Sequence, residues 1–240
     1  MPVLTILEES ARELGLDLTK QQVERFERFV EVLMDWAERV SLTAVRELEG
    51  IQQRHLVESA AIIPALAEHG LTLKEHSLID VGSGSGVPGI PLKILEPSLR
   101  LTLVEAKQRK AEFLSALLPE LGLSDVTVVT RRAEEAGHDP RYREQYDFAV
   151  AKALAPLRTL AELTLPFVRM GGVVIAPKGK EAEAEAKDAR VALETLKGSL
   201  RGIEPLPLSQ PQQHIILLDK DLPTPQRFPR RPGVPAKRPL

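Results

Sequence analysis

The amino-acid sequence predicts an α/β fold: a doubly wound, mostly parallel sheet, with a helical cap before it and an extended basic tail after it. From residue 77 onward, short β-rich runs alternate with helical patterns, which is typical of a parallel sheet with helices on both faces. The first third of the chain shows helical patterns, and the end of the chain alternates prolines with cations. We therefore divide the chain into 1–70, 71–220 and 221–240.

The cap is predicted from two well-marked helical patterns that follow a short first helix. Thr19 and Gln22 form a capping-box pair at the start of the second helix. Its apolar residues recur at helical spacing: Val23, Phe26, Val30, Leu33, Met34 and Ala37. A third helix is expected from about 49 to 66, with a buried stripe of Ile51, Leu56, Ala60 and Ile63. These apolar faces need a partner surface, so we expect the region to pack on the sheet domain.

The middle region is expected to hold six strands, at 78–81, 99–104, 126–130, 148–151, 173–176 and 213–218. Helices are expected at 107–121, 156–168 and 179–196. We interpret the last of them, which is rich in Ala and Glu, as a solvated face without a chemical role.

The tail contains no acid after Asp221, while arginines and lysines alternate with prolines. Proline disfavours helix and central strand, so we expect the cations to project from an extended, poorly folded arm. Such an arm is either a solubilising terminus or a contact for phosphate.

Composition limits the chemistry. The 240 residues are 43% hydrophobic, which is enough to bury a full core, and a net charge of −2 favours neither nucleic-acid nor acidic partners. The chain has no cysteine, which excludes disulfides and thiolate chemistry, and its five histidines show no metal-ligand spacing. No apolar run is long enough to cross a membrane. We expect a cytoplasmic monomer without a bound metal.

A glycine-rich turn follows the first predicted strand, in the run Asp80-Val-Gly-Ser-Gly-Ser-Gly86. Gly82, Gly84 and Gly86 allow positive φ and close approach of a ligand to the backbone. Both Gly86 and Gly89 are present, so the pattern alone does not separate a dinucleotide from other cofactors. Asp80 fits poorly beside a pyrophosphate and well beside the ammonium and sulfonium of S-adenosylmethionine.

Further acids extend the predicted cofactor site. Glu105 directly follows the second strand, about twenty residues after the glycines, where a carboxylate reaches ribose hydroxyls. Ala133 and Glu134 follow the third strand, where a backbone N–H and a carboxylate could read an adenine edge. No lysine of the P-loop type follows the glycines. Together these features favour an adenosine-containing cofactor.

The chain resembles a known family, the bacterial 16S rRNA guanine-N7 methyltransferases called RsmG or glucose-inhibited division protein B (GidB). The resemblance rests on segments spread over nearly the whole chain: Ser41-Leu-Thr-Ala-Val-Arg46, Arg54-His55 with Glu58-Ser59, Asp80-Val-Gly-Ser-Gly-Ser-Gly-Val-Pro-Gly-Ile-Pro91, Arg132-Ala-Glu134, Pro177-Lys-Gly179 and the basic tail from Thr224 to Lys237. It implies the Rossmann-like fold of class I S-adenosylmethionine-dependent methyltransferases, and methyl transfer to N7 of one guanine in the 530 loop of 16S rRNA or an assembling small subunit.

The resemblance also implies roles for individual residues. Gly82, Val87, Glu105, Ala133 and Glu134 are expected to line the cofactor, with Lys152 near its methionyl end. Members of the family often have Arg where this chain has Lys152, and Lys keeps the charge but loses the bidentate fork. The residues expected to face RNA are Arg46, His55, Arg132, Lys178, Arg230 and Arg231.

Some of these residues have structural alternatives. His55 is also compatible with a hydrogen-bonded core or cap histidine, and Lys178 with a helix-start or surface cation. Arg132 is equally compatible with an ion pair to Glu135. Three other functions also remain open: a methyltransferase acting on a protein or small molecule, an adenosine-nucleotide-sensing regulator, and a nicotinamide oxidoreductase. The glycine spacing and the lack of a second catalytic domain disfavour the last.

Overall fold

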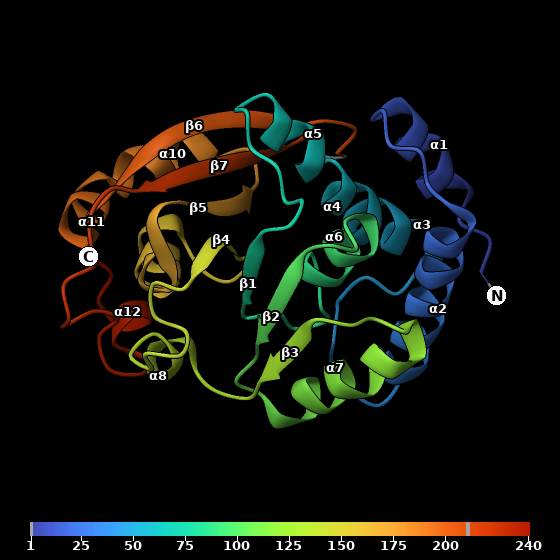
Figure 1. Ribbon diagram of the computed structural model, residues 1–240, viewed down its shortest axis with the longest axis horizontal. Coiled ribbons are helices and arrows are strands. Elements are labelled where there is room, and N and C mark those ends of the chain that lie inside the picture. The colour runs from blue at the N-terminus through green and yellow to red at the C-terminus, as the bar shows by residue number, and fades with distance from the viewer. Residues whose placement is uncertain (1, 210–211) are drawn as a thin grey trace.

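The structure of the protein, a computed structural model, describes residues 2–209 and 212–240. Seven strands form one sheet in the order β3-β2-β1-β4-β5-β7-β6, with helices on both faces (Figure 1). The strands β1 to β5 are parallel, β7 is antiparallel to β5, and β6 is antiparallel to β7. The predicted doubly wound, mostly parallel sheet is confirmed.

The elements have these bounds in chain order. The strands are β1 (Ser77–Val81), β2 (Arg100–Val104), β3 (Val126–Val129), β4 (Tyr146–Val150), β5 (Val168–Lys178), β6 (Gly198–Leu206) and β7 (Gln213–Lys220). The helices before the sheet are α1 (Thr5–Glu13), α2 (Lys20–Ala37), α3 (Leu48–Ile51), a π-helical segment (Gln52–Val57), α4 (Glu58–Ala60) and α5 (Ile62–Ala67). The later helices are α6 (Gly89–Leu95), α7 (Gln108–Leu121), α8 (Ala133–Ala136), α9 (Leu157–Thr164), α10 (Ala182–Asp188), α11 (Arg190–Leu196) and α12 (Val234–Lys237).

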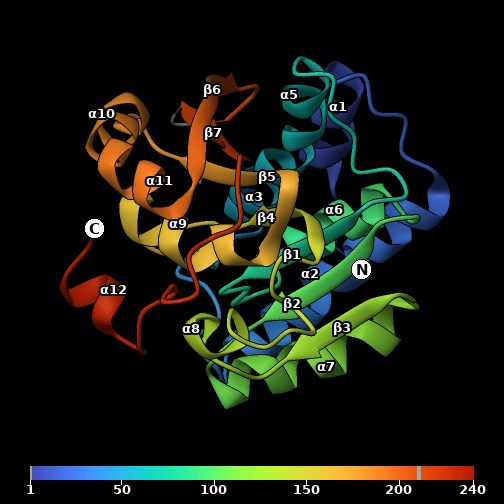
Figure 2. The ribbon, with the colours of Figure 1, turned by 60° about the vertical axis from the view of Figure 1, so that its left-hand side comes forward.

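Two hydrophobic clusters lie on opposite faces of the sheet. One joins the N-terminal helices with α6, α7 and one face of the strands. The other joins α9, α10 and α11 with the other face, and includes Phe228 of the tail (Figure 2). No helix among the described residues is both long and apolar enough to cross a membrane.

The helix α2 shows how the N-terminal region is fixed to the sheet domain. The predicted capping box is present, and the Gln22 side chain also donates to the carbonyls of Ile94 and Leu95, both at 3.0 Å. The Arg25 Nε donates to the Leu121 carbonyl at 3.1 Å. These donors satisfy carbonyls at the C-terminal ends of α6 and α7. Of the predicted apolar stripe, Phe26, Val30 and Leu33 are fully buried, whereas Met34 is exposed.

Several element predictions differ from the structure. The edge strand β6 was not predicted, because Gly202 and Pro205 interrupt its β-rich pattern. The third helix contains the π-helical segment instead of running as one α-helix. The segment 179–196 forms two helices separated at Ala189, and each packs an apolar side on the second cluster.

The tail is folded, which corrects the prediction of an extended, poorly folded arm. Phe228 is buried against the second cluster, and the buried Arg143 donates to the carbonyls of Thr224 (2.7 Å) and Phe228 (2.8 Å). The tail carbonyls thus meet an arginine of the sheet domain. The short helix α12 begins at Val234 with Pro235 in its first turn, where proline costs no helical hydrogen bond.

Candidate active site

A cavity lies at the carboxyl ends of the parallel strands, beside the glycine turn that follows β1. It measures about 290 Å³, and its lining joins the turn, the segment after β4 and the cap: Leu42, Thr43, His55, Gly82, Ser83, Gly84, Ser85, Val87, Lys110, Lys152 and Ala153. The strand order reverses between β1 and β4, where ligands bind in open α/β sheets. We call it the cofactor cavity.

The three turn glycines all have positive φ, but their surroundings differ. A Cβ at Gly84 (φ +56°) would meet no heavy atom closer than 3.7 Å, so this glycine leaves open space at the cavity. A Cβ at Gly86 (φ +79°) would lie 2.8 Å from Ile90 Cγ1, and one at Gly82 (φ +75°) 2.7 Å from Leu154 Cδ1. Gly82 and Gly86 therefore permit close packing against neighbouring side chains as well as the turn itself.

Asp80 has a different position from the one expected of a cofactor-binding acid. Its side chain is buried, and Oδ2 accepts from the backbone N–H of Gly89 at 2.9 Å, at the start of α6. Burial raises the pKa of Asp80 to about 7, the Gly89 hydrogen bond opposes this, and the charge of Glu105 adds to it. Its carboxyl group is engaged by the protein backbone rather than presented to the cavity.

Glu105 lies at the end of β2, as the sequence predicts. Its carboxylate accepts from the backbone N–H of Gly84 (3.0 Å) and of Lys107 (2.7 Å). The two hydrogen bonds tie the glycine turn to the second strand and hold a buried carboxylate beside the cofactor cavity.

A second cavity of about 460 Å³ adjoins the first. Four residues line both: Thr43, His55, Lys152 and Ala153. The remaining lining comes from the cap, the C-terminal end of β5 with the residue after it, α10 and the start of β7: Ala44, Val45, Arg54, Glu58, Pro177, Lys178, Gly179, Glu185 and Gln213. We call it the cap cavity, since it lies between the cap and the sheet domain.

Two lysine–carboxylate pairs line the cap cavity. Lys152 Nζ lies 2.7 Å from Glu58 Oε2 and also donates to the Arg54 carbonyl. Lys178 Nζ lies 2.8 Å from Glu185 Oε2 and donates to the Ala155 carbonyl at 2.7 Å. Burial lowers the pKa of Lys152, while the Glu58 carboxylate acts in the opposite direction.

His55 lies where the two cavities meet. Its Nε2 is 2.9 Å from Thr43 Oγ1, so the π-helical segment is linked to the loop before α3. Burial, together with the nearby charge of Lys152, lowers the pKa of His55 to about 4. The imidazole is therefore neutral at pH 7.

The other predicted RNA-facing residues lie outside these two cavities. Arg46 is exposed and lines an adjacent hollow of about 210 Å³ together with Thr43 and Val45. Arg132 is exposed at the N-cap of α8, and Arg231 is exposed in the tail. Arg230 is not free, which corrects its assignment: it forms a 2.5 Å ion pair with the fully buried Glu162.

Ala133 and Glu134 open α8, beside the folded tail. The Glu134 Oε1 accepts from the backbone N–H of Gly233 at 2.8 Å. This carboxylate, expected at an adenine edge, thus holds the tail in the present structure.

Sequence reasoning did not assign Glu58, Glu185 or Thr43 to the site. Glu58 belongs to a segment that carries the family resemblance, and Glu185 lies in the stretch that the sequence indicates as a solvated face. The alternation of Ala and Glu gives Glu185 no local signal, because its partners Lys178 and the Leu157 N–H come from other elements.

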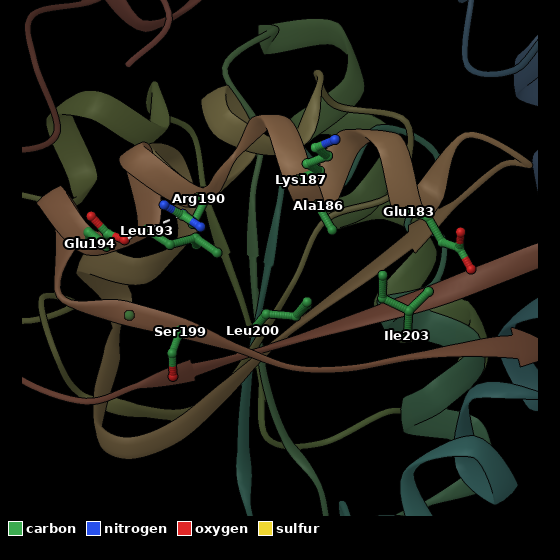
Figure 3. Close-up of a pocket in the computed structure, with 10 residues that line it drawn as sticks. Glu183, Ala186, Lys187, Arg190, Leu193, Glu194, Ser199, Leu200 and Ile203 are labelled. Atoms are coloured by element: carbon green, nitrogen blue, oxygen red, sulfur yellow. Dashed lines mark ion pairs between the residues drawn. The ribbon is translucent and has the colours of Figure 1, made fainter.

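A further cavity of about 400 Å³ lies between α10, α11 and β6 (Figure 3). It is lined by apolar groups such as Leu193, Leu200 and Ile203, and it shares no residue with the two cavities described above. Across residues 2–209 and 212–240, no group of three or more His, Asp or Glu side chains is placed to hold a metal ion.

Comparison with known proteins agrees with this geometry. The family model "GidB: rRNA small subunit methyltransferase G" matches residues 22–216. The chain belongs to this family. It is 44% identical to ribosomal RNA small subunit methyltransferase G of Roseiflexus sp. (strain RS-1), over 99% of this chain and 100% of that protein. It is 38% identical to the protein of the same name from Alkaliphilus metalliredigens, over 98% of each chain.

Solved structures show the same fold at low sequence identity. A mutant of MtNAS in complex with S-adenosylmethionine matches with a TM-score of 0.55 and 16% identity, over 91% of this chain and 78% of that one. A chain of the fibrillarin/Nop5p complex matches with a TM-score of 0.51 and 16% identity, over 70% and 84%. The fold is that of the Rossmann-like class I methyltransferases.

Proposed function

We propose that this GidB family member transfers a methyl group from S-adenosylmethionine to N7 of one guanine in the 530 loop of 16S rRNA. The observation that carries the proposal is the pair of adjoining cavities at the carboxyl ends of β1 and β4, in a chain of this family. One cavity accounts for the cofactor and the other for a base, and Lys152 and His55 lie between them.

The residues of the cofactor cavity suit S-adenosylmethionine. The open space at Gly84 lets the ligand approach the backbone, and the buried carboxylate of Glu105 is available to ribose hydroxyls once it exchanges its backbone partners. Val87 adds an apolar wall. When bound, S-adenosylmethionine supplies an electrophilic methyl group on a positively charged sulfur.

The protein's part in the reaction is alignment and exclusion of water. Guanine N7 carries a lone pair and no proton at neutral pH, so it needs no general base before it attacks the methyl group. The neutral His55 agrees with this, since its pKa of about 4 leaves no imidazolium at pH 7. Holding N7 in line with the methyl group accounts for most of the acceleration.

The acceptor base must leave its stack to enter the cap cavity. N7 lies on an edge that the deep, narrow groove of A-form RNA hides from side chains, so a loop or a turned-out base is required. The exposed Arg46, Arg132 and Arg231 are available to backbone phosphates around the cavities. The chain would meet this substrate in the cytoplasm, as free rRNA or as an assembling small subunit.

A radiolabelled methyl assay tests the acceptor class. The protein is offered unmethylated small subunits, total protein and small metabolites in parallel, with S-adenosylmethionine as the donor. We expect label in 16S rRNA alone. Label in protein or metabolites would favour the corresponding methyltransferase, and the absence of turnover with every acceptor would favour a regulator.

A matched glycine pair tests the cofactor cavity. Gly84 and Gly122 share φ +56°, and a Cβ at either one has no close neighbour. Leucine at each position therefore carries the same backbone strain, about 1–2 kcal/mol, but only Gly84→Leu fills the cavity. We expect Gly84→Leu to abolish binding of S-adenosylmethionine in calorimetry and Gly122→Leu to retain it. Equal affinities in the two variants would refute the assignment.

A further inference from the structure

The pair Lys152 and Glu58 places one donor next to an acceptor group on the wall of the cap cavity. Lys152 Nζ and Glu58 Oε2 are 2.7 Å apart, and the Glu58 side chain is 8% exposed. A buried ion pair is costly to desolvate and contributes little net stability, so its position at a cavity calls for another role.

Both members have hydrogen-bonding capacity left over. An ammonium group has three donors, and Lys152 uses two of them, on Glu58 and on the Arg54 carbonyl. A carboxylate has about four acceptor positions, and Lys152 is the sole hydrogen-bond partner of Glu58 within the described part of the chain. The pair can therefore still offer one N–H and a carboxylate to a ligand.

The second pair, Lys178 and Glu185, is more fully used by the protein. Glu185 Oε2 accepts from Lys178 Nζ and also from the Leu157 backbone N–H at 2.7 Å, at the start of α9. Glu185, on α10, thus holds the start of α9 and the C-terminal end of β5 together. This leaves Lys152 and Glu58 as the better candidates for ligand recognition.

Guanine has the complementary pattern. Around its rim, the acceptors N7 and O6 are followed by the donors N1–H and N2–H. A lysine matches O6, and a carboxylate matches the two N–H groups together. Adenine would instead turn an amino group toward the ammonium and a lone pair toward the carboxylate, so it would be repelled at both positions.

The placement of the pair also orients N7. Lys152 lines both cavities, whereas Glu58 lines only the cap cavity. If O6 lies at Lys152, then N7, the neighbour of O6, lies on the cofactor side, and N1 and N2 lie deeper in the cap cavity.

From these observations we infer that Lys152 and Glu58 determine base specificity: Lys152 donates to guanine O6, and Glu58 accepts from N1–H and N2–H. This inference rests on the proposed function and extends it to the residues that select the base. Lys152 was expected at the methionyl end of the cofactor, and its position between the cavities gives it a contact with the base.

Inosine tests the inference, since it keeps N7, O6 and N1–H but lacks the N2 amino group. The guanosine that the wild-type protein methylates in the small subunit is mapped first. Subunits are then assembled on rRNA ligated to carry guanosine or inosine at that position, and kcat/KM is measured for each. Wild type should prefer guanosine by roughly ten-fold, the effect of one specific base hydrogen bond.

Glu58→Gln should lose most of this preference, because glutamine can accept only one of the two N–H groups. Its preference should fall to about two-fold, with lower kcat/KM on guanosine. Glu185→Gln is the matched control, since it makes the same charge change in the same cavity, and its preference should stay at the wild-type value. Thermal unfolding and S-adenosylmethionine binding show whether each variant is folded.

Equal use of guanosine and inosine by wild type, or an unchanged preference in folded Glu58→Gln, would overturn the inference. The wild-type comparison does not depend on the folding of any variant. If wild type forms no 7-methylguanosine at all, the proposed function fails and this inference with it. If it forms 7-methylguanosine without discriminating between the bases, only the inference fails.

Discussion

At the residue scale, Asp80 ties the glycine turn to the helix that follows it. Its Oδ2 accepts from the Gly89 N–H, and a Cβ at Gly89 would lie only 2.7 Å from this oxygen, so glycine is required there. Burial raises the pKa of Asp80 to about 7, against 3.8 for the ordinary group. Between about pH 4 and pH 7 the folded protein keeps a proton that the unfolded chain has released, so its stability falls as the pH rises.

Asp80→Asn removes this titration but keeps an oxygen for the Gly89 N–H. We expect the free energy of unfolding of wild type to fall relative to that of the variant by roughly 2 kcal/mol between pH 5 and pH 8. Urea denaturation at the two pH values measures this difference. The exposed Asp17→Asn, measured in parallel, serves as the control for the loss of one carboxyl group.

A difference between wild type and Asp80→Asn that does not change with pH would contradict this account. It would mean that Asp80 is already ionised in the folded protein at pH 5.

Residue-scale features could be predicted where the signal is local in the chain. The glycine turn and Glu105 follow from their spacing after apolar strands, and both lie where the pattern indicates. The pair Glu58 and Lys152 is separated by 94 positions, so no local pattern connects the two residues. Asp80 is an opposite case, because the sequence pattern points to the acid but not to its partner, the N–H of Gly89.

At the element scale, the tail is a folded segment held by buried charges of the sheet domain. Arg230 pairs with Glu162, whose side chain is fully buried, and it also donates its backbone N–H to Glu162 Oε1 at 2.8 Å. His138 Nε2 lies 2.7 Å from the Pro229 carbonyl, and a Cβ at Gly137 would meet Pro229 Cγ at 2.8 Å. The tail thus completes the surface around α8 and α9.

Arg230→Ala should destabilise the protein by about 3–5 kcal/mol, because it leaves the Glu162 carboxylate buried without its charged partner. Arg231→Ala is the matched control. That neighbour is exposed, so its loss should change the free energy of unfolding by less than about 0.5 kcal/mol. Chemical denaturation of both variants measures the difference.

Similar small losses in Arg230→Ala and Arg231→Ala would show that the tail is not docked in solution. In that case Arg230 would return to the set of free cations available to RNA.

The elements that the sequence predicts best are those with continuous apolar runs. The strands β1, β2 and β4 are buried inside the sheet, and they and the edge strand β3 were placed within a few residues of their observed bounds. β5 is longer than predicted, because Gly171 and Gly172 hide its first half. The tail was misjudged because prolines predict little about burial: Phe228 and the carbonyls around it find partners far away in the chain.

At the scale of the whole molecule, the cap and the sheet domain each supply part of the candidate site. Arg54, His55 and Glu58 come from the cap, Lys152 from the segment after β4, and Lys178 from the C-terminal end of β5. The reversal of strand order at β1 and β4 brings these segments to one edge of the sheet. Alternating strands and helices predict such a sheet, but they do not predict which cap residues will lie over its edge.

The most direct test of the central claim is the chemical identity of the product. The protein is incubated with unmethylated small subunits and S-adenosylmethionine carrying an isotope-labelled methyl group. The rRNA is then digested to nucleosides for mass spectrometry, and the modified position is mapped. We predict labelled 7-methylguanosine from a single position in the 530 loop of 16S rRNA. Label in any other methylated nucleoside, with none in 7-methylguanosine, would contradict the account.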